Sequence, residues 1–228
     1  MHSSTAARDP RHHSQTTTIA AVVAATQQGE PTTPESSTDS APSRTVDGFL
    51  LPGLGVWDID PGHAHVAFTG RHFMLTKVRG QFTEVEGAIV VAENVGDSTV
   101  NVVIGMASVE SGNQSRDDHM RSADLFDVER FPVATFRSVR VDWIGTRGVV
   151  HGNLTIHGVT RQVTLEVSFE GYVRDPWGGH RAVFSAHTNV NREDFGITWN
   201  VGLEAGGVVS KEIKINLEIE TVLRRPER

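Results

Sequence analysis

Charged and imidazole side chains gather in three short segments that lie between the strand-like regions of the sequence. One segment is predicted to be helical, one is a tight turn, and one is a polar loop. An arginine offers a planar set of donors that suits phosphate or carboxylate, so these segments could bind the polar part of a ligand. The alternative, which the residue types favour, is that the charges pair with each other or cap loop backbone. The candidates are Arg116, Asp117, His119, His157, Arg192 and Asp194.

The eleven histidines raise the question of a metal site. His63 and His65 are two residues apart, so on a strand their imidazoles share a face, which suits metal ligation. His72 could approach them after a turn. We expect hydrogen-bonded or exposed imidazoles and no cofactor. A metal-binding or redox-associated stress protein built on these three histidines is the alternative.

Catalytic motifs are absent from the sequence. With no cysteine, the chain has no disulfide, thiolate nucleophile or Cys-ligated metal. It also lacks a serine nucleophile elbow, a P-loop and a dinucleotide fingerprint. A dyad of His119 with Asp117 or Asp118 could do acid–base work, but it is equally a capping interaction. We therefore expect a protein that is not an enzyme, with an enzyme acting on an amphiphile as a further alternative.

The net charge of -7 argues against general nucleic-acid binding, because that requires a basic surface to neutralise phosphates. No apolar run approaches the roughly 18 residues of a membrane-spanning helix. From the composition we therefore expect neither nucleic-acid binding nor a membrane-spanning helix.

Residues 1–48 differ in composition from residues 49–228. The first part has no aromatic residue and is rich in Ser, Thr, Ala and Pro, so it cannot bury enough apolar surface to offset chain ordering. We expect a disordered tail followed by one domain. The apolar run Ile19–Ala25 follows Arg8 and Arg11 and resembles a weak secretory signal. Its short length favours a cytoplasmic location, with a secreted or periplasmic one as the alternative.

Apolar and polar residues alternate along most of residues 49–228, as in 163–169 and 213–219. Strand side chains point alternately to two faces, so each such segment buries one face. Short glycine-bearing links, such as 144–148, join antiparallel neighbours. The predicted strands are 63–69, 82–91, 100–106, 139–143, 149–156, 163–169, 182–190 and 213–219.

One segment, Asn113–Leu125, has helical spacing and no Pro or internal Gly, and is predicted to cap or cover one end of the fold. Eight antiparallel strands, each with one apolar face, can shelter those faces by closing into a barrel. We therefore predict an all-β fold, an eight-stranded antiparallel barrel with a short helical lid. A two-sheet sandwich is the alternative.

The inward faces of the predicted strands are rich in aromatic and aliphatic side chains. An eight-stranded barrel can be filled by such side chains or can hold one ligand, and alternation alone does not separate the two. If a cavity is present, each buried CH₂ of a ligand contributes about 0.8 kcal/mol, so chain length itself supports binding. The apolar candidates are Phe68, Phe82, Ile104, Met106, Phe126, Phe136, Trp143, Leu154, Phe169, Phe184 and Phe195.

Several motifs in a fixed order resemble the YceI-like family of bacterial proteins over residues 57–222. The sequence departs from the family pattern at Ala64, Val85, Met120 and Leu125, which keeps an apolar interior but changes its shape. The motifs that carry the resemblance are Asp60–His63, Val78–Phe82, Arg116–Asp127, Phe131–Pro132, Phe136–Ser138, Gly152–Arg161 and Asn191–Gly196.

The resemblance implies an extended lipocalin-like barrel that binds isoprenoids or other long-chain amphiphiles. Together with the apolar alternation, it favours a hollow barrel over a filled one. We therefore expect a non-catalytic carrier of a polyisoprenoid, an isoprenoid quinone or a fatty-acyl lipid. Family members occur both in the cytosol and in the periplasm. Exposed strands could also support a homodimer.

Overall fold

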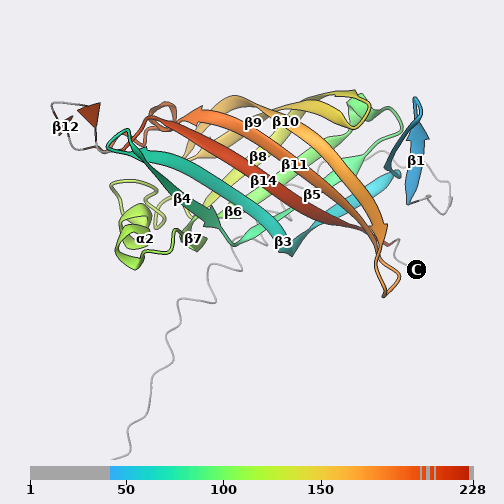
Figure 1. The fold of residues 1–228 in the computed structure, drawn as a ribbon, viewed down its shortest axis with the longest axis horizontal. Coiled ribbons are helices and arrows are strands. Elements are labelled where there is room, and N and C mark those ends of the chain that lie inside the picture. The colour runs from blue at the N-terminus through green and yellow to red at the C-terminus, as the bar shows by residue number, and fades with distance from the viewer. Residues whose placement is uncertain (1–41, 201, 204–205, 208, 226–228) are drawn as a thin grey trace, which may run out of the picture.

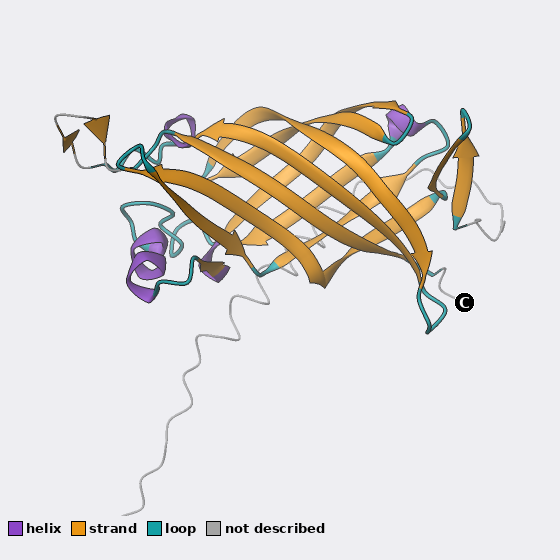
Figure 2. Cartoon of the chain, viewed as in Figure 1, coloured by secondary structure: helices purple, strands orange, loops and turns teal. Residues whose placement is uncertain are grey.

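The computed structural model describes residues 42–200, 202–203, 206–207 and 209–225. The expectations for residues 1–41, including the signal-like run Ile19–Ala25, lie outside these residues. Within them the chain is mostly β-strand (Figures 1 and 2). No helix in this part of the chain is both long and apolar enough to span a bilayer.

Eight antiparallel strands form a closed barrel, which confirms the predicted fold class. Each strand pairs with the next around the barrel, and β14 pairs with β3 to close it, so the sandwich alternative is wrong. The strands run obliquely around an elongated body (Figure 1). In order around the barrel they are β3 (Gly55–His72), β5 (Val85–Val91), β6 (Thr99–Gly105), β8 (Val133–Ile144), β9 (Arg147–Ile156), β10 (Val159–Arg174), β11 (His180–Asn191) and β14 (Glu212–Leu223).

The predicted strand 82–91 is divided into two strands. β4 (Thr76–Phe82) pairs with the second half of β3, whereas β5 pairs with the first four residues of β3. The break falls at Thr83 and Glu84, whose backbone N–H groups donate to the Ser108 hydroxyl at 3.1 and 3.0 Å. A side chain thus satisfies the backbone donors that a continuous strand would have paired.

An N-terminal hairpin covers one end of the barrel (Figure 1). Its strands, β1 (Ser43–Val46) and β2 (Phe49–Pro52), are joined by Asp47 and Gly48 at φ 50° and 83°. Positive φ at both central residues is the geometry of a tight hairpin turn, and Asp-Gly suits it. The boundary predicted between residues 48 and 49 therefore falls inside a folded element.

The other end of the barrel carries the helix α2 (Gln114–Arg121). The side chain of Asn113 caps the helix by accepting from the N–H of Arg116 at 3.0 Å. The helix is shorter than the predicted 113–125 because Ser122 leaves the helical conformation, with an extended backbone at φ -67° and ψ 170°. Arg121 fastens the helix to β7 (Val109–Glu110), donating to the carbonyl of Val109 at 2.6 Å.

Short elements complete both ends. At the α2 end, η2 (Met106–Ser108) takes Met106 out of the predicted strand 100–106, and its N–H donates to the carbonyl of Pro132 instead. The others are η1 (Val95–Asp97), η3 (Arg192–Phe195), β12 (Gly202–Leu203) and β13 (Gly206–Gly207).

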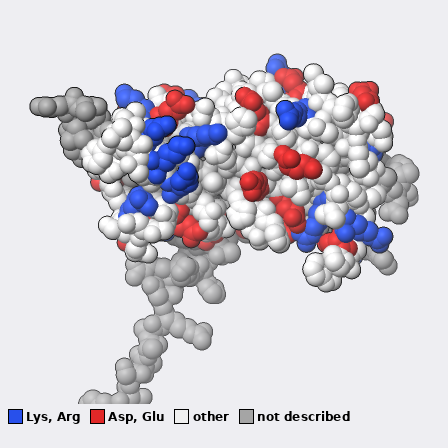
Figure 3. Space-filling model, in the orientation of Figure 1, with Lys and Arg blue, Asp and Glu red and all other residues white. Residues whose placement is uncertain are grey.

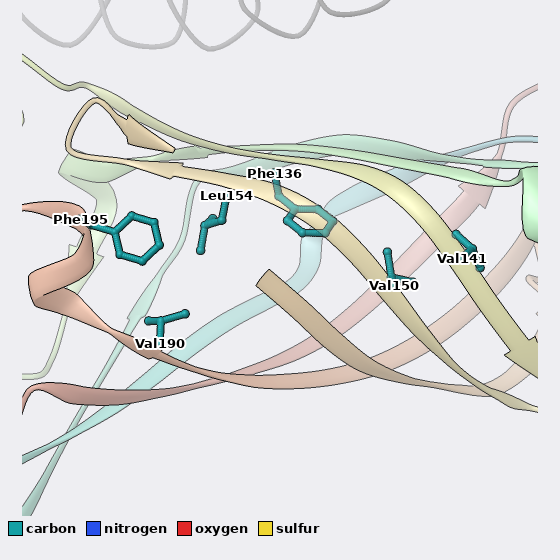
Figure 4. Close-up of a cluster of buried hydrophobic side chains, with 6 residues drawn as sticks. All are labelled: Phe136, Val141, Val150, Leu154, Val190 and Phe195. Carbon is teal, nitrogen blue, oxygen red and sulfur yellow. The ribbon is translucent and has the colours of Figure 1, made fainter. Parts of the chain in front are cut away.

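Buried side chains project into the barrel from alternate positions of its strands. Figure 4 shows one cluster, built from β8, β9, β11 and η3. The buried apolar side chains of the barrel pack in such clusters along its inner face. The members of this cluster are Phe136, Val141, Val150, Leu154, Val190 and Phe195.

Candidate functional site

A cavity of about 320 Å³ runs through the barrel interior. All eight barrel strands contribute inward-facing side chains to its lining, and nearly all of these are apolar. Cavities of a few hundred Å³ are the size of small-molecule binding sites. The barrel is therefore hollow, with room for an apolar guest.

Ten of the eleven apolar candidates line this cavity. The positions of the seven that lie in strands follow from period-two alternation, because every second residue of an inward-facing strand points to the same face. The other three, Met106, Phe126 and Phe195, lie in η2, a loop and η3. Phe68, Phe82 and Phe126 form a row of tilted rings with centroids 5.6 and 5.7 Å apart. The ten are Phe68, Phe82, Ile104, Met106, Phe126, Phe136, Trp143, Leu154, Phe184 and Phe195.

Phe169 is buried but is not part of the lining. Its ring packs on Phe184 at 5.4 Å and on a cluster around Leu51 and Trp57. That cluster closes the end of the barrel that the N-terminal hairpin covers. We call this the hairpin end and the opposite one, where Arg192 lies, the Arg192 end.

Arg192 is the predicted polar residue that reaches the cavity. It is 5% exposed and lines the interior beside Phe195. Its guanidinium donates to the backbone carbonyls of Ser210 at 3.0 Å, Ile197 at 2.7 Å and Trp199 at 2.9 Å. It thus caps loop backbone, as the alternative had anticipated, and does not pair with Asp194, which is exposed.

One nitrogen of the Arg192 guanidinium makes no hydrogen bond among the described residues. Nη2 is buried and has no hydrogen-bond partner among the described residues. Burial lowers the pKa of Arg192, since desolvation disfavours the charged form. A buried donor without an acceptor is costly, and at the end of an apolar cavity it is the group that a polar ligand atom would satisfy.

Three other polar candidates form a structural network around α2. Arg116 donates to the Ser111 hydroxyl at 2.7 Å and to the Ser111 carbonyl at 2.9 Å, and the same hydroxyl donates to the buried Asp117. His119 lies 3.1 Å from Asp124 and packs edge-on against Trp199. None of the three lines the cavity as described. They tie α2 to its surroundings.

His157 lies in the turn between β9 and β10, with a positive φ of 52°. Its ring packs against Phe131 with centroids 4.5 Å apart. Neither His157 nor Asp194 is among the described residues that line the cavity. The structure therefore does not bring the six polar candidates together around one opening.

The three histidines of the metal alternative are not brought together. His63 and His65 share the outer face of β3, but His72 lies at the far end of the same strand, about 23 Å from His65 at 3.3 Å per residue. His63 instead approaches Asp60 and Glu220. The guanidinium of Arg181 contacts both carboxylates, so a cation of the protein already occupies that position.

A second guanidinium, that of Arg44, lines the hairpin end of the cavity. It donates to the carbonyls of Ala92 at 2.6 Å and Glu93 at 2.7 Å, which fixes the hairpin to the end of β5. Arg44 is not among the predicted site residues, because the composition of residues 1–48 predicted a tail. The signal was present, since Asp47-Gly48 before an apolar run is a hairpin pattern.

Comparison with known proteins identifies relatives of this barrel. The model of the YceI-like domain matches residues 57–221. A UPF0312 protein of Yersinia enterocolitica, YE1254, is 38% identical over 166 residues, which cover 72% of this chain and 84% of the relative. The match begins after the N-terminal hairpin, so β1 and β2 lie outside it.

Solved structures share the fold. The YCEI protein of Campylobacter jejuni is 26% identical, with a TM-score of 0.59 over 68% of this chain and 90% of that one. A polyisoprenoid binding domain from Saccharophagus degradans aligns over 75% of this chain and 99% of its own, with a TM-score of 0.57. At 17% identity, this second likeness shows the fold alone.

Proposed function

Because the chain belongs to the YceI-like family, we propose that it binds one long-chain amphiphile inside its barrel and releases it unchanged. The guest is a polyisoprenoid, an isoprenoid quinone or a fatty-acyl lipid. The protein sequesters the apolar chain from water and transports it between partners, without catalysis. The polyisoprenoid binding domain with the same fold supports the first of these guests.

The observation that carries this proposal is an apolar cavity with a guanidinium at each end, of which that of Arg192 is the more buried. The lining offers hydrocarbon from all eight strands, and each CH₂ that leaves water contributes about 0.8 kcal/mol. Such a lining does not require polar groups along the chain of the guest. Affinity therefore depends on the length and shape of the chain.

The Arg192 end offers the more deeply buried polar group, while Nε of Arg44 at the hairpin end is also buried without a hydrogen-bond partner among the described residues. The unpartnered Nη2 of Arg192 can donate to a carbonyl, carboxylate or phosphate oxygen, and the charge strengthens that bond. We place the polar end of the guest near Arg192, because both terminal nitrogens of Arg44 are already bonded to the carbonyls of Ala92 and Glu93. Thr188 and Ser98 are further polar groups on the wall.

A matched pair of variants tests the proposal. Ala186 lines the cavity, so Ala186→Trp fills it, whereas Gln162→Trp adds the same ring to an exposed position on the neighbouring strand β10. Native mass spectrometry of protein from its own host, and after titration with palmitate, a polyprenol and a quinone, measures the bound guest.

We expect one guest per chain in the wild type and in Gln162→Trp, and none in Ala186→Trp. Protein that carries no guest and takes up none of the three probes would contradict the proposal. So would equal uptake by Ala186→Trp when its circular dichroism and melting temperature match those of the wild type.

A further inference from the structure

The turn between β3 and β4 exposes three consecutive apolar side chains. Phe73 and Met74 are each 50% exposed and Leu75 is 80% exposed. We call Phe73–Leu75 the apolar tip. Single exposed apolar residues are normal on a protein surface, but a contiguous apolar projection marks an interaction site.

The backbone geometry of the tip does not favour the residue types found there. The N–H of Leu75 donates to the carbonyl of His72 at 3.1 Å, and the two residues between them have φ of 50° and 59°. Positive φ at both central positions is the type I′ geometry, which favours Asn and Gly. Phe73 and Met74 occupy it at a steric cost, and the His72 ring supports Phe73 at 4.0 Å.

Four cations lie on the outer face of the barrel directly behind the tip. Arg71 is opposite Lys77 across β3 and β4, and Thr69 is flanked by Arg79 on one side and Lys214 on the other. We call Arg71, Lys77, Arg79 and Lys214 the basic collar. All four are exposed, and Figure 3 shows Lys and Arg gathered on this part of the surface.

The collar lacks an anionic partner in the part of the chain that the structure describes. No ion pair joins any of its four members to a carboxylate among the described residues. Like charges placed opposite each other on neighbouring strands repel. Cations on β4 could serve to protect a sheet edge, but Lys214 lies on β14, which is paired on both sides.

The opposite end of the barrel also exposes apolar side chains, and several of its charges are paired within the protein. Trp177 is 82% exposed in the turn before β11. Close to it, Asp175 and Glu220 pair with Arg181, and Asp58 pairs with Arg224. Two exposed arginines, Arg174 and Arg225, also lie at this end, where Arg225 donates to the carbonyl of Gly178. Acidic and basic groups are thus mixed around Trp177, whereas the four cations of the collar stand behind the apolar tip, so the β3–β4 end is the better match for an anionic surface.

From this combination we propose that the apolar tip inserts into an anionic phospholipid bilayer while the basic collar contacts its headgroups. Apolar side chains buried at the interface and cations near anionic lipids are the two contributions that hold peripheral proteins on membranes. The docking surface goes beyond the binding of a guest, because it lies on the outside of the barrel and can be measured with the cavity empty or full.

Docking would place the Arg192 end of the cavity at the lipid. The N–H of Ser210 donates to the carbonyl of Arg71 at 2.9 Å, and the carbonyl of Ser210 accepts from Arg192. His72 also bridges to Val209, which lines the cavity. Val209 and Ser210 thus connect the strand that carries the tip to the polar end of the cavity.

Co-sedimentation of the full chain with vesicles tests the proposal. Phosphatidylcholine vesicles are compared with vesicles that also contain phosphatidylglycerol, at low and high NaCl. The double variant Phe73→Asn/Met74→Gly installs the residues that a type I′ turn favours, so the fold is kept while two apolar side chains are removed. Trp177→Ser is the matched control at the other end.

We expect the wild type to bind the anionic vesicles and to lose binding as salt rises. The double variant should bind at least about tenfold more weakly, while Trp177→Ser is unchanged. Lys77→Gln/Lys214→Gln should also weaken binding, whereas Lys211→Gln, which removes a cation already paired with Glu193, should not.

No binding of wild type to anionic vesicles would overturn the proposal, and so would equal losses in Phe73→Asn/Met74→Gly and Trp177→Ser. Collar variants that aggregate yet bind vesicles normally would assign Lys77 to edge protection and overturn the role of the collar. Uptake of a guest, followed by native mass spectrometry on the same samples, shows separately whether the cavity functions.

Discussion

Arg192 donates from Nε to the backbone carbonyl of Ser210 at 3.0 Å, across 18 residues of chain. Ser210 is itself held by Arg71, whose N–H donates to the Ser210 hydroxyl at 2.9 Å. One guanidinium thus connects the cavity, the loop before β14 and the end of β3. The arrangement explains how a charged side chain is tolerated at the end of an apolar barrel.

Replacing Arg192 should therefore cost stability as well as affinity. Arg192→Met leaves the carbonyls of Ile197, Trp199 and Ser210 without their donor, and we expect the free energy of unfolding to fall by about 3 kcal/mol or more. Chemical denaturation measures the change. The control Arg161→Met, at an exposed position, should stay within about 0.5 kcal/mol of the wild-type stability. An Arg192→Met variant as stable as the wild type would refute the structural role of Arg192.

Gly80 should control the shape of the cavity near β4. It is paired with Phe68 across β3 and β4, and a Cβ at Gly80 would overlap the Phe68 ring, which lines the cavity. We expect Gly80→Ala to push the ring inward, to cost about 1–3 kcal/mol and to shift the preference toward shorter guests.

Competition between saturated fatty acids of different length measures that preference. Gly62→Ala is the control, because its Cβ would meet Asp60 at an ordinary 3.4 Å. An unchanged length preference in a folded Gly80→Ala would show that Phe68 does not limit the guest.

The charge cluster around Arg181 should stabilise the fold in a pH-dependent way. The Arg181 guanidinium lowers the pKa of Asp60 below its ordinary 3.8, although desolvation partly opposes this. A carboxyl whose folded pKa is depressed adds stability above its unfolded pKa, and this stability is lost as pH falls through the folded pKa. The network therefore contributes fully at neutral pH and fades below about pH 4.

Melting temperatures from neutral pH downward test this for Arg181→Gln. The variant should be less stable than wild type at neutral pH, and the difference should shrink as the pH falls below that range. Arg161→Gln, whose guanidinium bonds a backbone carbonyl, should show no such trend. A difference for Arg181→Gln that is independent of pH would contradict the assignment.

Arg44 should hold the hairpin end closed. Arg44→Ala removes the donors to Ala92 and Glu93, so β1 and β2 should open more often while the barrel remains folded. Hydrogen exchange at Leu51 should quicken by about tenfold, corresponding to one or two lost hydrogen bonds. Unchanged exchange at Leu51 would show that apolar packing alone secures the hairpin.

The barrel could be predicted from the sequence because apolar and polar residues alternate along much of its strands. Residues 163–169 and 213–219 each lie within a longer observed strand, and every apolar position of these runs except Phe169 faces the cavity. The exception has a local cause. The register of β10 with β11 shifts between Phe169 and Gly171, and packing against the hairpin end holds Phe169 there.

The polar site was less predictable. Alternation states which face a strand residue occupies, but it does not place loops relative to one another, so Arg116, His157 and Arg192 could not be ranked by sequence alone. Arg192 is distinguished by backbone carbonyls from residues 197, 199 and 210, which only the folded loop brings together. Arg44 was not predicted as a cavity residue because it follows a segment rich in Ser, Thr, Ala and Pro.

Titration of guest-free protein with a homologous series of fatty acids and polyprenols is the most direct test of the central claim. Native mass spectrometry should show one guest per chain, with affinity that rises with chain length until the cavity is full. The same guests should fail to bind Ala186→Trp. The account would be contradicted if the folded wild type bound none of the series stoichiometrically, or bound all members equally regardless of length.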